Sequence, residues 1–459
     1  MTEHRSVPGP PGALGLRNLY RFTTDQLNLL TDLRARHGDT VRLKVLGKPW
    51  YLFSHPDDIE AVMLEHHKIM GRDQYIVVLQ RALGMGLLTS DGELWKRQRR
   101  LMATAFTPKR IKSYADTMVE VTDRALRPWR DGLQINLHKE MSRVTMQVVA
   151  EVLFGTGVTP NDVDTVGRSL EVLNEYFANS PEAMLMLPKW VPTPRNLRVE
   201  RAVKDIDSIL YRIIAERRAS GEEREDLLGR LLAAQDDDGT SMTDQQLRDE
   251  AVTLFLAGHE TTALALAHTI YFLSKHPDVR RRVFAELDEV VGDRAPEAGD
   301  YKRLEYLGRV LKESMRLLPP AWTTGREATE DVEIGGYFVP KGAQILLSQW
   351  VVHRDPRWFP NPEAFDPERW ADTSELPRYA YFPFGGGPRV CIGNHFAMME
   401  ATLVLAAVLQ RYRVDLLPGE KLELKPSVTL RQKGPGLRAR LFARADRAVT
   451  ARSTSATAA

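Results

Sequence analysis

One apolar segment in the second half of the chain limits the possible folds more than any other feature. From Asp244 to Lys275 the sequence keeps helical periodicity, and Pro277 ends it. Thr243 and Gln246 have the spacing of a capping box at its start. A helix of this length spans about 48 Å at 1.5 Å per residue. Because its middle is apolar around nearly the whole circumference, we expect it to cross the centre of the protein.

Most of the remaining chain also has helical periodicity, but three regions favour β structure. Residues 41–54 and 331–348 each predict a hairpin, and a third β region is expected at about 413–442. The sequence therefore predicts a mainly α fold with a small β portion. We expect a flexible N-terminus at residues 1–7, a single large domain at residues 8–443 and a disordered tail at residues 444–459.

Composition and charge exclude several classes of protein. Hydrophobic residues make up 43% of the chain and charged residues 27%, which is ordinary for a soluble globular protein. The net charge of +2 favours neither a nucleic-acid partner nor strong attraction to a membrane. No apolar run approaches the ~20 residues that span a bilayer, and the N-terminus lacks the apolar core of a signal peptide. We therefore expect a cytoplasmic protein without a membrane anchor.

Cys391 is the only cysteine in the chain, and it lies in the glycine-rich stretch "FGGGPRVCIG" from Phe384 to Gly393. A single thiol forms no internal disulfide and cannot supply a cysteine-rich zinc site or an iron–sulfur cluster. Three roles stay open for it: a small buried core residue, a nucleophile, or the one thiolate ligand of a metal cofactor.

The stretch "AGHETT", from Ala257 to Thr262, interrupts the long apolar helix. Gly258 costs about 1 kcal/mol relative to alanine in a helix interior, and a glutamate at position 260 is costly to bury without a partner. The stretch is either a tolerated polar kink or a groove against which a small ligand sits. In the second case Glu260 and Thr261 supply an acid and an alcohol for proton transfer. His259 is either a helix-surface residue or part of this function.

Two further pairs have helical spacing. Glu313 and Arg316 are three residues apart, which by itself indicates a surface ion pair, although Arg369 could join them in a buried cluster. Trp95 and Arg99 are four apart in a basic stretch that is typical of a solvated face.

Together, these stretches resemble the cytochrome P-450 family of haem-thiolate monooxygenases from about residue 8 to 443. The cysteine loop fits the family pattern F-x-x-G-x-x-x-C-x-G, and the interrupted helix fits [A/G]-G-x-[D/E]-T-[T/S]. The two pairs fit E-x-x-R and W-x-x-x-R, and all four motifs have the family's order. The loop pattern is specific, whereas the shorter patterns are weak when taken alone.

The resemblance implies that Cys391 is the axial ligand of a non-covalent haem b. A thiolate ligand donates electron density and favours O–O cleavage in this family. The other residues that the resemblance assigns to the cofactor are Trp95, Arg99, Ala257, Gly258, Arg326, Phe384, Gly385, Arg389 and Gly393. The arginines and Trp95 would reach the haem propionates. His395, four residues after Cys391, would begin the next helix as a structural residue.

The same resemblance implies the reaction. One atom of O2 enters the substrate, and Glu260 and Thr261 act as the acid–alcohol pair that relays protons. The chain has no flavin or NAD(P) fingerprint, so electrons would come from a separate ferredoxin or flavodoxin with its reductase. The "GMG" at residues 84–86 lacks the strand–turn–helix context of a dinucleotide motif. Lys96, Arg97 and Arg100 could help to steer an acidic partner.

The segments that line the pocket in this family correspond to residues 72–88, 173–195, 320–324 and 427–430. They are apolar, aromatic and Met-rich, which favours a hydrophobic ligand such as a fatty acid, terpenoid, steroid or macrolide. Two other functions stay open. One is a haem-thiolate peroxygenase or isomerase-type enzyme that needs no external electrons, and the other is a cofactor-free cysteine hydrolase.

Overall fold

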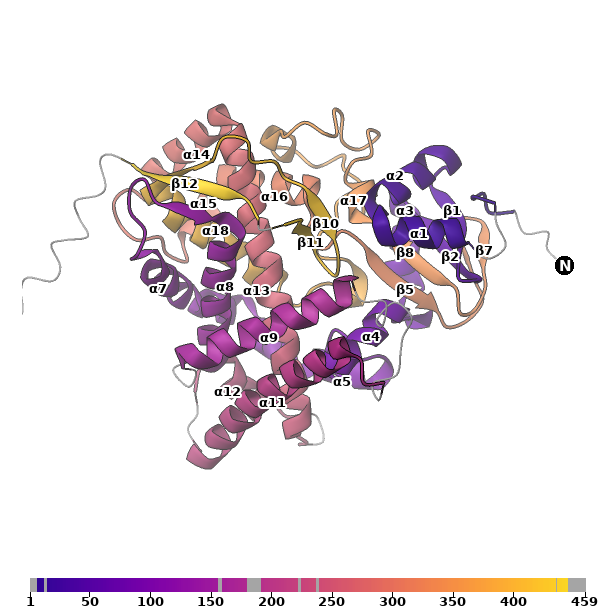
Figure 1. Cartoon of the computed structure of the whole chain (residues 1–459), viewed down its shortest axis with the longest axis horizontal. Coiled ribbons are helices and arrows are strands. Elements are labelled where there is room, and N and C mark those ends of the chain that lie inside the picture. Colours follow the sequence, from indigo (N-terminus) through magenta and orange to yellow (C-terminus); the bar gives the residue numbers. More distant parts are fainter. Residues whose placement is uncertain are drawn as a thin grey trace, which may run out of the picture.

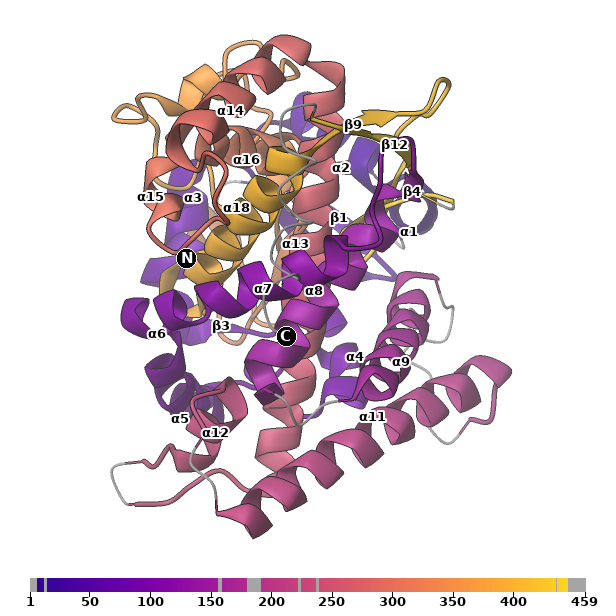
Figure 2. The same ribbon diagram turned by 90° about the vertical axis from the view of Figure 1, so that its left-hand side faces the viewer.

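Helix α13 (Asp244–Lys275) begins and ends at the residues that the sequence predicts. The Gln246 N–H donates to Thr243 Oγ1 at 3.2 Å and the Thr243 N–H donates to Gln246 Oε1 at 3.0 Å, so the predicted capping box is present. Most of its side chains are buried, and the helix runs through the middle of the helical part of the molecule (Figure 2). The prediction of a long central helix is confirmed.

The computed structural model describes residues 6–11, 15–155, 159–179, 191–221, 224–236, 239–434 and 436–444. The terminal segments predicted to lack order, 1–7 and 444–459, lie outside these residues except for residues 6, 7 and 444. None of the helices within the described ranges is both long and apolar enough to cross a membrane.

Helices surround much of α13 (Figures 1 and 2), and strand β9 also contacts it. Those of the N-terminal half are α1 (Leu16–Thr24), α2 (Gln26–His37), α3 (Pro56–Glu60), α4 (Gln74–Leu83), α5 (Gly92–Ala103), α6 (Pro108–Ser113), α7 (Ala115–Leu126), α8 (Leu137–Phe154) and α9 (Pro160–Asn179). Those that follow are α11 (Pro194–Ser220), α12 (Leu227–Ala233), α14 (Pro277–Val290), α15 (Asp300–Arg303), α16 (Glu305–Leu317), α17 (Gln349–Val352) and α18 (Asn394–Arg411). Helices α8, α16 and α18 pack directly on α13.

Within the described residues, the strands form one mixed sheet of five strands and three smaller sheets. The five-stranded sheet has the order β1 (Thr40–Val45), β2 (Lys48–Phe53), β8 (Gln344–Leu347), β5 (Thr324–Ala328) and β3 (Met70–Gly71). The smaller sheets contain β4 (Gln134–Asn136), β12 (Arg438–Ala443) and β9 (Tyr412–Leu416); β6 (Val332–Ile334) and β7 (Tyr337–Val339); and β10 (Leu424–Pro426) and β11 (Leu430–Gln432). The mainly α fold with a small β portion is thus confirmed.

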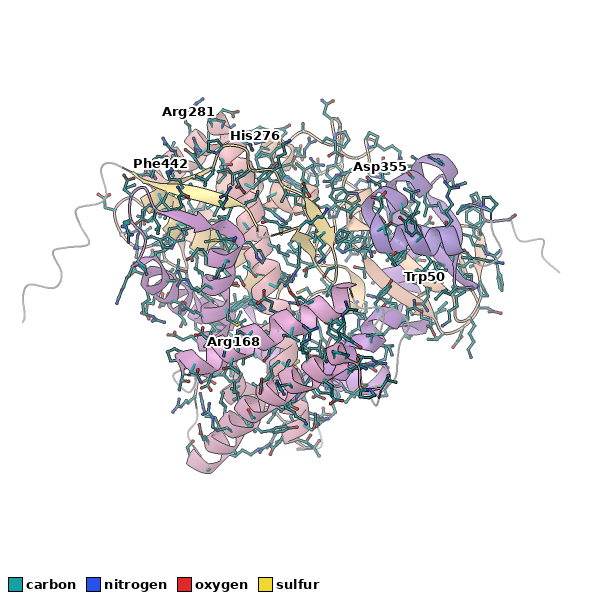
Figure 3. The ribbon with its side chains drawn as sticks, viewed as in Figure 1. Trp50, Arg168, His276, Arg281, Asp355 and Phe442 are labelled. Carbon is teal, nitrogen blue, oxygen red and sulfur yellow. The ribbon has the colours of Figure 1, made fainter. Side chains whose placement is uncertain are left out.

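The five-stranded sheet and the first two helices form a separate lobe beside the helical part (Figure 1). Trp50 of β2 is buried there (Figure 3) and packs edge-on against Phe22 of α1, with ring centroids 5.5 Å apart. Strands β1 and β2 pair antiparallel, which confirms the first predicted hairpin.

The second predicted hairpin, over residues 331–348, is right for its first half and wrong for its second. Strands β6 and β7 pair across the turn at Gly335 and Gly336. Residues 344–347 leave this hairpin and form β8, which pairs parallel with β2 and antiparallel with β5. All four side chains of β8 are buried, so this strand belongs to the core sheet rather than to a surface hairpin.

Candidate active site

The cysteine loop is a tight turn whose shape depends on two glycines. Gly385 and Gly387 have φ angles of +70° and +62°, a region that residues with side chains rarely adopt. A Cβ atom on Gly387 would also lie 1.9 Å from the carbonyl oxygen of Met63. The Cys391 N–H closes the loop by donating to the Phe384 carbonyl at 3.0 Å. The loop therefore delivers Cys391 to a fixed position just before α18.

The side chain of Cys391 is accessible, although protein atoms surround it. Burial raises the pKa of its thiol, whereas a hydrogen bond from the Gly393 N–H and the positive charge of Arg99 lower it. These two groups stabilise the thiolate, which is the form that binds a metal. His395 lies exposed on the first turn of α18, and its structural role stays a prediction.

The interrupted part of α13 presents an accessible strip. Ala257 is exposed and Gly258 and Thr261 are half-buried, on a helix that is otherwise mostly buried. The hydroxyls of Thr261 and Thr262 donate to the carbonyls of Ala257 and Gly258 at 2.7 and 3.0 Å, which is the hydrogen bond that bends helices. Thr262 also lies beside the buried carboxyl of Glu400 on α18. This part of α13 thus packs against the helix that follows the cysteine loop.

The interpretation of His259 as a helix-surface residue is wrong. Its side chain is buried, and its Nδ1 lies 2.8 Å from the Phe255 carbonyl oxygen. Thr145 of α8 donates to the carbonyl oxygen of His259 at 2.9 Å. The residue therefore faces α8, because α8 and α13 pack closely at this point.

Glu260 is buried and held by three residues from α9 and from β11 with the turn before it. Its Oε2 accepts a hydrogen bond from Asn174 Nδ2 of α9 at 2.6 Å, and its Oε1 accepts one from Thr429 Oγ1 at 3.1 Å. Arg431 of β11 forms an ion pair with the same Oε1. Burial raises the pKa of Glu260, but the charge and hydrogen bond of Arg431 outweigh it, so the pKa lies below its ordinary value. Glu260 is therefore an ionised, partnered carboxylate and not an isolated acid.

The predicted pocket segments lie side by side in the described residues. The Arg81 guanidinium donates to the Tyr176 hydroxyl at 3.3 Å, which joins segments 72–88 and 173–195. The Trp322 indole N–H donates to the Ser427 carbonyl at 2.8 Å, which joins segments 320–324 and 427–430. Residues 180–190 of the second segment lie outside the described residues.

Three arginines gather beside the cysteine loop. Arg326 of β5, Arg389 and Arg72, which the sequence predicts only as part of the pocket segment 72–88, are close enough that their charges act on one another. Burial, followed by the charge of Arg389, lowers the pKa of Arg326 to about 10. Two carboxylates, Asp73 and Asp91, face the cluster, and Asp91 pairs with Arg389. Positive charge is therefore in excess, and a buried excess of this kind suits a bound anion.

Trp95 and Arg99 of α5 lie near the loop but in different surroundings. The Arg389 guanidinium carbon stands 4.2 Å from the Trp95 ring centroid, so these two predicted cofactor residues meet. Burial lowers the pKa of Arg99, while nearby Cys391 raises it. Arg99 thus faces the thiol, and Arg72 joins Arg326 and Arg389 instead. No motif in the sequence marks Arg72, because it stands alone between "KIMG" and "DQYI".

Glu313 and Arg316 of α16 form a buried ion pair, so the surface interpretation is wrong. Both side chains are 0% exposed, and two hydrogen bonds of 2.8 Å join them. Glu313 also accepts hydrogen bonds from Arg369 Nε at 3.0 Å, Trp370 Nε1 at 2.9 Å and the Asp366 N–H at 3.0 Å. The alternative with Arg369 in a buried cluster is confirmed.

Arg316 connects this cluster to the long irregular segment that leads to the cysteine loop. It donates to the carbonyls of His353, Pro362 and Ala364 at 2.9, 2.6 and 3.0 Å. His353 Nε2 in turn accepts a hydrogen bond from the Phe382 N–H at 3.0 Å, two residues before the loop begins. The cluster therefore supports the backbone from which the loop extends.

The basic residues of α5 are partly neutralised. Arg97 and Arg100 both pair with Asp236, at 3.1 and 2.8 Å, and exposed Lys96 pairs with Glu93 at 2.6 Å. A role in steering an acidic partner stays a prediction.

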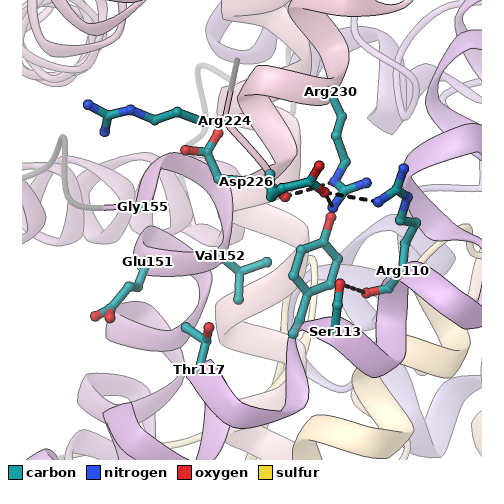
Figure 4. Close-up of a pocket in the computed structure, with 11 residues that line it drawn as sticks. Arg110, Ser113, Thr117, Glu151, Val152, Gly155, Arg224, Asp226 and Arg230 are labelled. Carbon is teal, nitrogen blue, oxygen red and sulfur yellow. Dashed lines mark hydrogen bonds and ion pairs between the residues drawn. The ribbon is translucent and has the colours of Figure 1, made fainter. Parts of the chain in front are cut away.

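A pocket of about 560 Å³ opens elsewhere, between α6, α7, α8 and α12 (Figure 4). It contains none of the predicted site residues. Several of its charges pair with each other: Arg110 and Arg230 both bind Glu225. It is therefore separate from the cysteine loop.

These residues fit a haem group. Cys391 offers one accessible sulfur with support for its thiolate form, and the arginine cluster has one positive charge more than its two carboxylates, Asp73 and Asp91, which suits an anionic group. The fold and the site define an oxidoreductase of the haem-thiolate class. The family model described as "Cytochrome P450" matches residues 7–437, and the chain belongs to the cytochrome P450 family.

Curated proteins and solved structures agree with this assignment. The chain is 38% identical to "Cyclooctatin synthase" of Streptomyces melanosporofaciens over 94% of each chain. It is 32% identical to "Pentalenene oxygenase" of Streptomyces avermitilis over 91% of this chain and 94% of that one. The solved structure of retinoic acid-bound cyanobacterial CYP120A1 has a TM-score of 0.83 at 28% identity, covering 96% of this chain and 100% of the other. The protein is a P450 monooxygenase, an enzyme class that uses O2, a substrate and a redox partner.

Proposed function

We propose that this enzyme inserts one atom of O2 into a terpenoid-type hydrophobic molecule. The observation that carries the chemistry is the single thiol of Cys391, which the Gly393 N–H and Arg99 favour as a thiolate. The terpenoid class is supported by relatives named "Cyclooctat-9-en-7-ol 5-monooxygenase", which is 35% identical, and "Pentalenene oxygenase". Apolar, Met-rich segments around the site are suited to such a substrate.

The proposed cofactor is haem b, bound within a haem domain of residues 8–443. Bound haem supplies the activation of O2. Cys391 would hold it through its thiolate, and Phe384, Gly385 and Gly393 shape the loop around the sulfur. Arg326 and Arg389, together with Arg72, bind its carboxylates, and Trp95 packs on Arg389. Arg99 stabilises the thiolate by its charge. Ala257 has a small side chain and Gly258 has none, so this accessible part of α13 leaves room for a flat ligand.

Thr261 and Glu260 are the proposed proton relay. The Thr261 hydroxyl donates to the Ala257 carbonyl and keeps its lone pairs for water in the accessible strip. Because Arg431 keeps Glu260 ionised, Glu260 accepts a proton from solvent before it can pass one on. Electrons come from a separate ferredoxin or flavodoxin with its reductase, and we place the reaction in the cytoplasm.

The test is a spectral titration of the purified enzyme, followed by turnover. Terpenoids, fatty acids, steroids and macrolides are added in turn, and displacement of the Soret band reports binding. We expect the terpenoids to bind best and product to require NAD(P)H together with the redox proteins. Turnover with hydrogen peroxide alone, at the same rate, would support the peroxygenase alternative. Protein without haem absorption would support the cysteine hydrolase.

A further inference from the structure

Two buried side chains at the short helix α17 hold the main chain of Phe382, two residues before the cysteine loop. The Phe382 N–H donates to His353 Nε2 at 3.0 Å, and the Phe382 carbonyl accepts a hydrogen bond of 3.5 Å from Gln349 Nε2. His353 is 0% exposed and Gln349 is 1% exposed. The His353 N–H donates to the Gln349 carbonyl at 2.9 Å, so one turn of helix presents both side chains on the same face.

The hydrogen bond from Phe382 defines the state of the His353 ring. A ring nitrogen that accepts from a main-chain N–H carries no proton, so the neutral ring carries its proton on Nδ1. Burial and the positive charges of Arg316 and Arg354 lower the pKa of His353 well below its ordinary value, although the main chain of Arg316 and Met315 acts in the other direction. A neutral ring agrees with its role as an acceptor.

Main-chain hydrogen bonds connect Phe382 to the cysteine. The Phe382 carbonyl accepts a hydrogen bond from the Gly385 N–H at 3.0 Å, and the Phe384 carbonyl accepts one from the Cys391 N–H at 3.0 Å. Gly385 is also one of the two glycines whose positive φ shapes the loop. A shift of Phe382 therefore moves the turn that ends at Cys391.

Aromatic rings hold the imidazole in place. The centroid of the His353 ring lies 4.9 Å from that of Tyr381 and 5.4 Å from that of Phe382. Tyr381 packs in turn on Trp370, with centroids 4.4 Å apart, and the Trp370 indole N–H donates to Glu313. The imidazole is thus connected to the buried Glu313 cluster as well as to the segment that begins the loop.

We propose that His353 is a positioning residue for Cys391: by accepting the Phe382 N–H, its Nε2 fixes the start of the cysteine loop and thereby the position of the sulfur. Gln349 holds the carbonyl of the same residue. Without the acceptor, the start of the loop would be free to shift and the sulfur would leave the cofactor more readily. The hydrogen bonds do not depend on the cofactor, whereas the effect on a bound haem rests on the proposed function.

The test compares His353→Leu, which removes the acceptor, with His353→Gln, which offers a carbonyl oxygen in its place. The readout is the ferrous–CO spectrum of the purified holoenzyme, followed as the red-shifted Soret band is lost in urea well below every unfolding midpoint. Because His353→Leu leaves a buried N–H unpaired, the band should be lost about tenfold faster or more. His353→Gln should restore a rate within about threefold of the unmodified protein.

Val41→Ala is the control for a general loss of stability, because Val41 is 0% exposed and lies in β1 at the edge of the five-stranded sheet. It should lose the band at the rate of the unmodified protein. An unchanged rate in His353→Leu, no restoration in His353→Gln, or an equally fast loss in Val41→Ala would each overturn the proposal.

A measurement on the unmodified holoenzyme decides the case in which His353→Leu does not fold. Nitrogen-15 NMR of histidine-labelled protein in the ferrous–CO form reports which ring nitrogen carries the proton, and the His353 signals are assigned by their loss in His353→Gln. We expect an unprotonated, hydrogen-bonded Nε2, and a proton on Nε2 would overturn the proposal. Protein without a haem spectrum would defeat the proposed function, whereas the ring signals would still decide the hydrogen bond to Phe382.

Discussion

Removing Arg316 should unfold the region around the cysteine loop and not merely slow the reaction. Arg316 is 0% exposed and is bonded twice to Glu313 and once each to three backbone carbonyls. Breaking a buried ion pair costs about 3–5 kcal/mol, and each buried acceptor left without a donor adds about 1–3 kcal/mol. Glu313 keeps its bonds to Arg369 and Trp370, which offsets part of this. These terms add to about 6–14 kcal/mol, and with the offset a loss of at least about 5 kcal/mol is expected for Arg316→Ala.

That loss equals the lower end of the stability of a typical domain, about 5–15 kcal/mol. The assay is soluble yield, haem per chain, and urea unfolding followed by circular dichroism. The matched control is Arg378→Ala, whose side chain is 66% exposed and lies 3.6 Å from Glu60. Its loss should stay below about 1 kcal/mol. Equal unfolding midpoints and equal haem content in the two variants would refute the reasoning.

Three further predictions concern the site. Cys391→Ser should lose most haem, and any that remains should lack the red-shifted Soret band of a thiolate-ligated ferrous–CO complex; persistence of that band would exclude Cys391 as the ligand. Thr261→Ala should keep haem and substrate binding but lower product per NAD(P)H, with hydrogen peroxide recovered instead, since general acid–base assistance is worth about 10²–10⁴-fold; unchanged coupling would mean that Thr261 only bends the helix. The ion pair between Arg431 and Glu260 should persist through neutral pH and weaken only as the pH falls below 4.5, because the pKa of Glu260 is lowered in the folded protein. Carboxyl titration followed by infrared spectroscopy would show this, and titration of Glu260 near pH 7 would contradict it.

Local rules account for what the sequence predicts well. The capping box, the apolar circumference and Pro277 act within a few residues of each other, so the bounds of α13 follow from the sequence. Likewise, the glycine-rich motif indicates positive φ angles, which Gly385 and Gly387 adopt, because the φ angle is a local property of the chain.

The errors and omissions lie where distant segments meet. Residues 344–347 join the five-stranded sheet because they pair with β2 and β5, and no local pattern in "QILL" predicts this pairing. The burial of Glu313 and Arg316 depends on Arg369 and on carbonyls more than thirty residues away. Arg72 and Arg431 are single arginines outside any motif, and only the fold brings them to the site.

The parallel pairing of β2 with β8 has a consequence for synthesis of the chain. About 290 residues separate Phe53 from Gln344. At about 5–20 residues per second, a ribosome takes roughly 15–60 s to reach the second strand after the first. During that time the inner edge of β2 exposes unpaired N–H and C=O groups, which invite pairing with other nascent chains. Production of this enzyme should therefore depend on chaperones that cover the N-terminal hairpin until β8 emerges.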